Sequence, residues 1–290
     1  MATEDALIFA KSQGIAVRYF SSTLETSVTR LSLTYAQERC VRLAGKLMQQ
    51  TGMLHPGARV GVAVSGGVDS FVLLQVLLIR RRIVPFPFEI VPLHINPGFD
   101  PHSHAPLTTW LAEHGVEGHV ELADHGPRAH SSENRRRSAC FYCAMLRRRR
   151  LFELCRDKGL THLAFGHNAE DQVSTFFMNL FQAGKVDGMA FREPFFNGRL
   201  MVIRPLMEVE KKLILKAASQ WKLPVWSNPC PSAGKTRRTE VLEEMEALCR
   251  PHKGRRRNMF NALFRMGLDR ALRTPVADGP VAADPDGDEL

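Results

Sequence analysis

The chain has 290 residues, of which 44% are apolar, and it carries a formal net charge of +9 at pH 7. This length suits one large domain with appendages, and no apolar run reaches the roughly 18 residues that span a bilayer. The chain starts with acidic residues before apolar ones, which is unlike a signal peptide. We therefore expect a cytoplasmic protein without a membrane partner.

The charge is unevenly distributed along the chain. The stretch from Thr274 to Leu290 holds five acidic residues and no Lys or Arg, so the remainder is more basic than the total indicates. A basic body suits a polyanionic partner, although a merely soluble basic protein would share this composition. The six cysteines are not expected to form a disulfide framework in a cytosolic protein.

Apolar periodicity and glycine or proline breaks predict the elements in chain order. Residues 1–33 show no clear period and form an extension of uncertain structure. Polar residues 124–138 are expected to be a mobile loop, residues 235–270 basic and helical, and the tail disordered. Helices are predicted at 35–50, 69–82, 105–114, 143–158, 169–182 and 208–221, and strands at 59–64, 88–95, 116–122, 161–165 and 200–204.

Strands and helices alternate from residue 59 to residue 221, which predicts an α/β fold with a parallel sheet and helices on both faces. Ligands of such sheets bind at the carboxyl ends of the strands. Three polar segments fall there: Ser65–Ser70, His94–Pro97 and Gly166–Asp171. The predicted domains are an extension (1–33), an α/β domain (34–225), a basic helical segment (226–273) and an acidic tail (274–290).

The sequence SGGVDS separates the first predicted strand from a helix. Gly66 and Gly67 allow close backbone approach to a ligand, and the helix N-terminus adds partial positive charge. Ser65 and Ser70 can donate hydroxyl hydrogen bonds, and Asp69 could hold Mg²⁺ or fix the loop. No lysine follows the glycines, unlike in a P-loop, so such a loop can cradle a departing pyrophosphate. The structural alternative is a plain strand–turn–helix.

Further polar residues follow the later strands. His94 and Asn96 end the second strand, and Gly166 ends the fourth, so all three are candidates for nucleotide binding. His167 and Asp171 are four residues apart, so we expect them to share a helix face. They could contact phosphate or Mg²⁺, or the helix could simply be capped there beside a surface histidine.

The SGGVDS loop resembles the SGGxDS signature of the PP-loop ATP pyrophosphatases. This resemblance implies an adenine nucleotide alpha hydrolase-like domain that cleaves ATP between its α- and β-phosphates and adenylates a substrate. Mg²⁺ is expected with ATP because it bridges phosphates and carboxylates.

Two cysteines, Cys140 and Cys143, have the spacing of metal ligands, which also suits a zinc pair or a redox dithiol. They belong to an ordered set of motifs: CFYC (140–143), GHNAED (166–171), VIRPL (202–206) and NPC (228–230). The set is similar to the tRNA 2-thiocytidine synthetase branch of the PP-loop enzymes, and the likeness runs from Tyr35 to Met266.

The resemblance implies that Cys140, Cys143 and Cys230 bind a [4Fe–4S] cluster with one iron open to sulfide. It implies an ATP-dependent sulfurtransferase acting on a tRNA cytidine in the anticodon loop, with sulfide or a cysteine desulfurase as donor. Members of the branch are often homodimers. The alternatives are the same chemistry on another base or small molecule, and an RNA-binding protein without turnover.

Two positions depart from the family pattern. Val68 stands where the family often has lysine, so the phosphate contacts could differ. Ser227 replaces the first cysteine of a C-x-x-C that the family often shows at the third ligand, which favours ligation by three cysteines.

Clustered arginines predict a surface for tRNA phosphates, although solvated charge is the alternative for each. Arg148 is in phase with apolar residues, so Arg147 and Arg148 are expected to face the site and Arg149 or Arg150 to face solvent or RNA. Cys40 and Cys155 are expected in the core. The candidate RNA-binding residues are Arg147, Arg148, Arg204, Lys235, Arg237 and Arg238.

Overall fold

The computed structural model describes residues 32–135, 138–227, 229–232, 234, 237–252 and 254–274. Of these, all from Leu33 onward belong to one compact unit. The predicted extension and acidic tail lie outside the described residues, apart from Ser32, Leu33 and Thr274. No helix in the described ranges is both long enough and apolar enough to cross a membrane.

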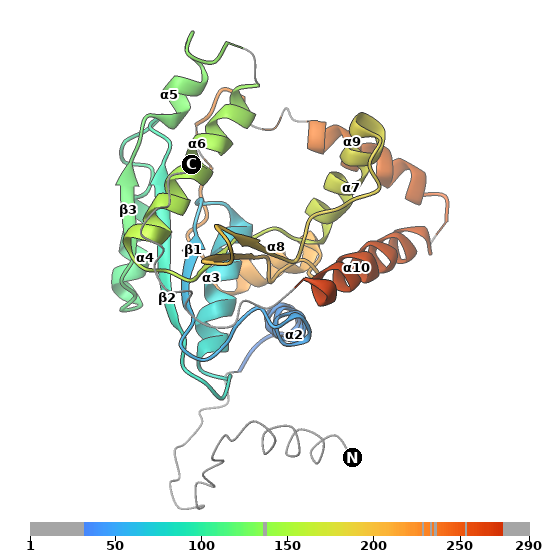
Figure 1. Cartoon of the computed structure of the whole chain (residues 1–290), viewed down its shortest axis with the longest axis horizontal. Coiled ribbons are helices and arrows are strands. Elements are labelled where there is room, and N and C mark those ends of the chain that lie inside the picture. The colour runs from blue at the N-terminus through green and yellow to red at the C-terminus, as the bar shows by residue number, and fades with distance from the viewer. Residues whose placement is uncertain are drawn as a thin grey trace, which may run out of the picture. The chain divides into compact units, whose positions relative to one another are not determined.

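A six-stranded sheet in the order β3-β2-β1-β4-β6-β5 organises this unit (Figure 1). All neighbouring strands pair in parallel except β5, which pairs antiparallel with β6. The α/β fold with a mostly parallel sheet is thus confirmed. The strands are β1 (Arg59–Ala63), β2 (Glu89–Asn96), β3 (His119–Leu122), β4 (His162–Ala164), β5 (Arg192–Phe195) and β6 (Leu200–Ile203).

The strand order reverses at β1, because the chain continues outward to β2 and β3 on one side and then to β4 and β6 on the other. This reversal creates a crevice between the carboxyl ends of β1 and β4, where open α/β sheets bind ligands. The predicted polar loops after β1 and β4 both open into this crevice.

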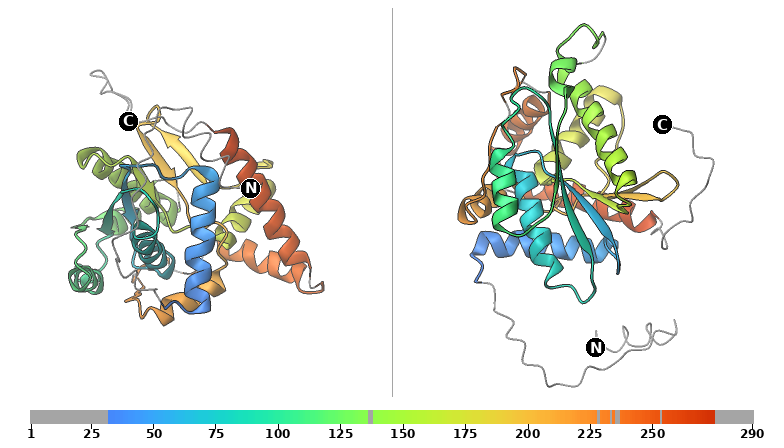
Figure 2. Two further views of the ribbon diagram at one scale, coloured as in Figure 1. Left: turned by 90° about the horizontal axis from the view of Figure 1, so that it is seen from below. Right: turned by 90° about the vertical axis from the view of Figure 1, so that its left-hand side faces the viewer.

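Helices cover both faces of the sheet. In the right-hand view of Figure 2, the sheet runs between α6 on one side and α3 and α4 on the other. The described helices are α2 (Tyr35–Thr51), α3 (Val68–Arg81), α4 (Ala105–Glu113), α5 (His125–Ala129), α6 (Ala139–Asp157), α7 (Ala169–Ala183), α8 (Lys211–Gln220), α9 (Arg237–Cys249) and α10 (Arg255–Arg273).

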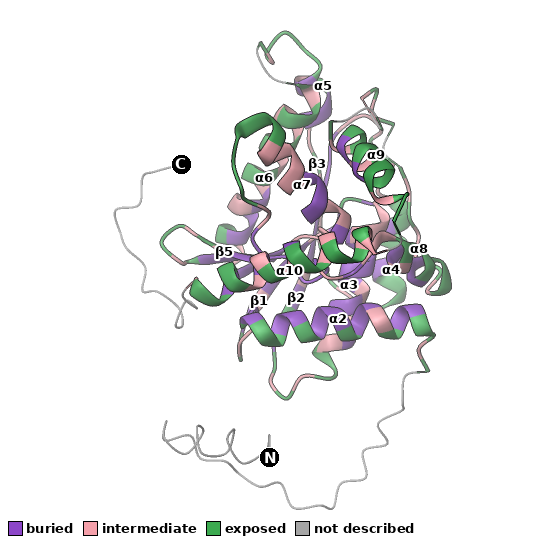
Figure 3. Ribbon diagram, turned by 90° about the vertical axis from the view of Figure 1, so that its right-hand side faces the viewer, coloured by how far each residue is buried: buried purple, intermediate pink, exposed green. Residues whose placement is uncertain are grey.

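Two apolar layers hold these helices to the sheet. Val60 and Val62 of β1 pack with Phe71 of α3 in a layer that also includes α2 and α8. On the opposite face, Leu93 of β2 packs with Leu154 of α6. Figure 3 shows the burial concentrated on the strands and on one stripe of α2. Removing such area from water is the main favourable term in folding.

Two local predictions are wrong. The segment predicted as a loop over 124–138 contains the short helix α5. Helix α6 begins at Ala139 rather than at residue 143, because the hydroxyl of Ser138 accepts a hydrogen bond from the backbone N–H of Phe141 and caps the helix. Cys140 and Cys143 therefore both lie near the start of α6.

The basic C-terminal region is helical, as predicted, and forms α9 and α10. These helices lie beside α7, at the right in Figure 1, and the end of α10 reaches β5, where Arg192 donates to the carbonyl of Ala271. Val173 of α7, Val241 and Met245 of α9 and Leu263 of α10 form their own small apolar cluster. The start of α9 is thereby held against the crevice side of α7.

Candidate active site

A cavity of about 190 Å³ lies at the carboxyl ends of β1 and β4. Apolar residues of β1, β2 and α6 form part of its wall. Its polar lining comes from residues that the sequence singled out: Ser65, Asp69, Ser70, Arg147, Gly166, His167, Asp171 and Arg238. Segments more than 100 residues apart along the chain thus meet in one site.

The loop after β1 is built by its backbone. Gly66 has φ of +90°, a conformation that L residues rarely adopt, and its carbonyl accepts a hydrogen bond of 3.1 Å from the Trp226 amide. A Cβ on Gly66 would lie 2.4 Å from the Trp226 ring. Gly67, which has no side chain to cap α3, leaves amides at that helix N-terminus available to an anion.

The Ser70 hydroxyl ties the two ends of this loop together. It donates to the carbonyl of Gly67 at 2.8 Å and accepts from the amide of Ser65 at 3.1 Å. Ser70 is buried, whereas Ser65 is exposed. The loop therefore holds its curved shape through contacts within the chain, and Ser65 offers its hydroxyl to the cavity.

Asp69 is held by two donors from other elements. Its carboxylate accepts a hydrogen bond of 2.9 Å from the Asn168 amide and lies 2.5 Å from the Lys211 ammonium. A Cβ on Gly166 would lie 2.9 Å from the backbone carbonyl of Asp69, so the turn after β4 passes directly over the loop. The sequence analysis did not identify Lys211, which begins α8.

The N-terminus of α7 supplies a second group of polar side chains. Asn168 and Asp171 form a reciprocal capping box, and Asp171 also pairs with Arg238 at 3.0 Å. Burial raises the pKa of Asp171, against the opposing effect of Arg238. This carboxylate therefore serves as a cap while it lines the cavity, so the two roles considered from sequence are both compatible with its position.

His167 precedes the cap of α7 and is not on the helix, which corrects the prediction of a shared helix face. Burial, assisted by nearby arginines, lowers its pKa to about 3. The ring is therefore neutral near pH 7, and its Nδ1 atom has no partner among the described residues. A neutral imidazole lining the cavity can accept or donate one hydrogen bond to a ligand.

His94 and Asn96 do not line the cavity. His94 Nδ1 donates to the carbonyl of Val64 at 2.7 Å, burial lowers its pKa, and its ring packs against Trp226. The Asn96 amide donates to the carbonyl of Asp100, and its oxygen accepts from Gly98. Both residues support the loops around the site in this structure, rather than facing the space that a nucleotide would occupy.

The three predicted cysteine ligands lie near one another, from α6 and from the segment after α8. Burial raises the pKa of Cys143; Arg147 opposes this effect, and the neighbouring Cys230 and Cys140 add to it. The Cys230 sulfur lies 3.9 Å from His130 Nε2. Arg147 also lines the cavity, so the cysteines adjoin this cavity through one shared side chain.

Within the described ranges, no group of three or more His, Cys, Asp and Glu side chains is placed to hold a metal ion. A mononuclear zinc site needs all of its ligands around one ion. An iron–sulfur cluster instead binds each thiolate at a separate iron. The donor set of three neighbouring cysteines beside a cationic arginine fits such an anionic, multi-iron group.

The other cysteines lie elsewhere. Cys40 and Cys155 are buried, and burial raises the pKa of each thiol to about 12, as befits the core positions predicted for them. Cys249 is the last residue of α9.

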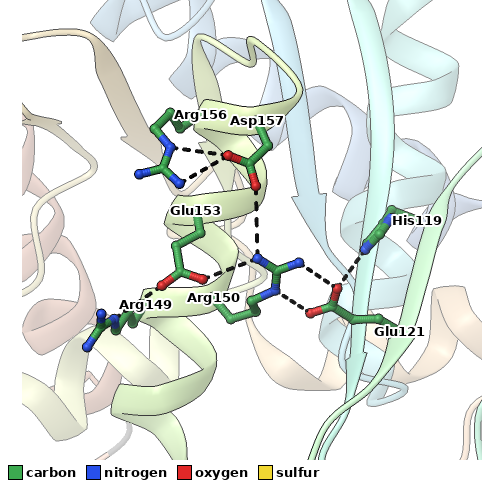
Figure 4. A network of polar contacts seen from close by, with 7 residues as sticks. All are labelled: His119, Glu121, Arg149, Arg150, Glu153, Arg156 and Asp157. Carbon is green, nitrogen blue, oxygen red and sulfur yellow. Dashed lines mark hydrogen bonds and ion pairs between the residues drawn. The ribbon is translucent and has the colours of Figure 1, made fainter.

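The arginines of α6 follow the prediction in part. Arg147 lines the cavity, and Arg148 is exposed, although its charge also lowers the pKa of His167 in the cavity wall. Arg149 pairs with Glu153, while Arg150 pairs with Glu121 of β3 at 2.7 Å (Figure 4). Arg150 therefore attaches α6 to the edge of the sheet, whereas the side chain of Arg149 is 66% exposed, as predicted for one of these two residues.

The remaining candidate RNA contacts are also dispersed. Arg204 is buried, and its guanidinium donates to the carbonyl of Ala190 at 2.6 Å, so it is not on an RNA-accessible surface here. Arg237 is exposed and pairs with Glu240, and Arg238 faces the cavity. Lys235 lies outside the described residues.

Comparisons with known proteins show the family to which this chain belongs. Residues 37–241 match the family model described as the PP-loop domain. A tRNA-cytidine(32) 2-sulfurtransferase of Bordetella petrii is 34% identical over 265 residues, covering 86% of this chain and 81% of that protein. A protein of the same name from Geobacter metallireducens is 34% identical over 238 residues, covering 79% of this chain and 91% of its own.

One solved structure shares the fold closely. It is the U34-tRNA thiolase NcsA from Methanococcus maripaludis with its [4Fe-4S] cluster, at a TM-score of 0.64 and 21% sequence identity. The match covers 80% of this chain and 80% of that chain.

Proposed function

The chain belongs to the PP-loop family and, within it, to the tRNA-cytidine(32) 2-sulfurtransferases, and from this premise we propose that it thiolates tRNA at the expense of ATP. The observation that carries the proposal is the place of Arg147. Its side chain lines the cavity beside the glycine loop and also acts on Cys143. The cavity at the glycine loop therefore adjoins the cysteines, which supports a two-step reaction of activation and sulfur transfer.

The first step uses the glycine loop. The amides at the start of α3 cradle the pyrophosphate portion of ATP, and Asp69 or Asp171 would hold Mg²⁺, which would offset the negative charge of the phosphates when bound. The C2 oxygen of a tRNA pyrimidine attacks the α-phosphate, and pyrophosphate leaves. This step is needed because an amide-like oxygen is a poor leaving group, whereas the same oxygen leaves readily as part of AMP.

The second step replaces that oxygen. Cys140, Cys143 and Cys230 would hold a [4Fe–4S] cluster, which supplies, when bound, an iron without a protein ligand that can carry sulfide. Sulfur forms its bond to C2, and AMP departs with the original oxygen. Sulfide or a cysteine desulfurase is the source of sulfur. Arg147 lies between the two sites, where its charge stabilises both phosphate and thiolate.

The tRNA is held by exposed cations around the crevice. Arg148 and Arg237 are the exposed members of the predicted set, and contacts of this kind attract phosphates without reading sequence. A base in a tRNA loop is unstacked easily and can reach such a crevice. By family membership, we propose cytidine in the anticodon loop as the acceptor.

The test uses anaerobically purified protein with unmodified tRNA, Mg-ATP and sulfide, followed by digestion and mass measurement of the nucleosides. We expect 2-thiocytidine. A different thionucleoside would support the same reaction but would show that another base of the tRNA is the acceptor. No thionucleoside, in a protein shown to contain iron and acid-labile sulfide, would contradict a tRNA acceptor. Cys230→Ala should abolish product, and Cys249→Ala is the matched control that should not.

A further inference from the structure

The phosphate loop of this chain lacks a cation of its own. In a P-loop, a lysine directly after the last glycine reaches the terminal phosphates. Here Val68 occupies that position, and its partly buried side chain packs against the apolar core. The carboxylate of Asp69 lines the cavity in the next position, so the loop by itself presents a negative charge where phosphates would bind.

A lysine from another element lies against this carboxylate. The ammonium of Lys211 is 2.5 Å from Asp69 Oδ2, across 142 residues of sequence. The Lys211 backbone amide donates to Glu170 Oε2 at 2.8 Å, which fixes the start of α8 beside the start of α7. The side chain of Lys211 is 37% exposed and that of Asp69 is 28% exposed, so solvent screens the pair only in part.

The neighbouring lysine shows that this placement is specific to one residue. Lys212 pairs with Glu210 at 3.1 Å, and its side chain is 71% exposed. It has the same chemistry and lies on the same helix turn, but it does not approach the loop. Lys212 is therefore a control matched in sequence, charge and helix position.

We propose that Lys211 supplies the positive charge of the phosphate loop, in place of a lysine at position 68. The inference rests on the proposed function only in that the cavity takes ATP. Lys211 is a positioning residue, because it acts through Asp69: it orients the carboxylate and cancels the repulsion that an uncompensated negative charge would exert on the phosphates. The charge comes from α8, so loop and helix must both be in place for ATP to bind.

The experiment measures Mg-ATP binding to the full chain by calorimetry, without tRNA or sulfide. Lys211→Met should raise the Kd about tenfold, the scale of a charge-assisted contact moderated by partial exposure. Lys212→Met should leave the Kd unchanged. Lys211→Arg keeps the charge and should retain most of the affinity. Val68→Lys combined with Lys211→Met should restore binding, because the charge returns on the loop itself.

The possible results of this experiment distinguish a failure of the Lys211 inference from a failure of the proposed function. A Lys211→Met protein that binds Mg-ATP like the unmodified chain overturns the inference, and so does a folded double variant that stays as weak as Lys211→Met. If the double variant does not fold, Lys211→Arg decides: affinity as low as that of Lys211→Met contradicts a charge role. Failure of the unmodified chain to bind Mg-ATP would instead overturn the proposed function.

Discussion

The glycine loop and the cysteine site adjoin, yet they are built in different ways. The loop is shaped by backbone contacts, and glycines at 66 and 166 stand where a Cβ would collide with Trp226 or Asp69. The cysteines instead come from a helix start and a connecting segment, and Cys140 is exposed, with its sulfur 3.9 Å from the Ser232 carbonyl. Backbone contacts thus shape the glycine loop, whereas, among the described residues, fewer contacts within the chain hold the cysteine side chains.

The largest expected effect separates chemistry from folding in the cysteine site. Cys143→Ala should abolish thiolation while changing the unfolding free energy of the cluster-free protein by less than about 1 kcal/mol, because the side chain is only half-buried. Cys155→Ala should do the reverse, since that thiol is 1% exposed in the core: a loss of about 1–2 kcal/mol with thiolation retained. Chemical denaturation and the nucleoside assay measure both. If the Cys143→Ala protein still thiolated tRNA, the chemical role assigned to Cys143 would be refuted.

A substitution in the glycine loop should lower both the stability of the protein and its Mg-ATP binding. Gly66→Ala forces an alanine into φ of +90° and against Trp226, so we expect a loss of stability of about 2 kcal/mol or more together with loss of Mg-ATP binding. Gly67 has φ of −74°, where alanine fits, so Gly67→Ala is the matched control for the loss of stability alone. Thermal unfolding and calorimetry report the two effects. Equal behaviour of the two variants would show that the loop is not rigidly preformed.

The pH dependence of stability tests whether the His167 side chain is buried in the cavity wall. Its folded-state pKa, about 3, lies below the ordinary 6.5, so the unfolded chain binds the proton more readily. Its contribution to stability is complete above pH 6.5 and is lost as pH falls toward 3, with a slope of at most about 1.4 kcal/mol per pH unit. Denaturation across this range should show a shallower dependence for His167→Gln. An unchanged slope would place the imidazole in water.

The smallest effect tests how firmly α6 carries its cysteines. Arg150→Gln removes the bridge to Glu121 of β3 and should cost about 1 kcal/mol, whereas Arg149→Gln, 66% exposed, should cost at most about 0.5 kcal/mol (Figure 4). Urea denaturation at low and high salt measures both. A larger loss for Arg149→Gln would mean that the network is anchored at its solvent side.

Helices and strands with a periodic spacing of apolar residues could be predicted from the sequence, and those without such a spacing could not. The predictions for α2, α3 and β2 are confirmed within one or two residues because apolar spacing and glycine or proline breaks are local properties. Helix α5 is too short to show a period. Strand β5, with the sequence REPF, has polar residues and a proline, and it forms by pairing with β6 at the sheet edge.

In the site, too, features that are contiguous in sequence could be predicted and contacts between distant residues could not. The glycine loop and the cysteine spacing are contiguous in sequence, so their residue types reveal the chemistry. Lys211 has no local signal, because its meeting with Asp69 depends on how α8 packs beside α7. Arg204 was predicted to contact RNA because it is charged. The sequence alone does not reveal that this residue follows β6 into the interior, where it is buried.

The contact between Gly66 and Trp226 has a consequence for how this chain can evolve. Any side chain at 66 needs the space that the indole fills, so the two positions are expected to change together or not at all. Among descendants of this chain, a substituted position 66 should accompany a smaller residue at 226, whereas a lone change at 66 should be rare. Because residue 226 stands four positions before Cys230, changes in the glycine loop are restrained by the segment that holds this cysteine.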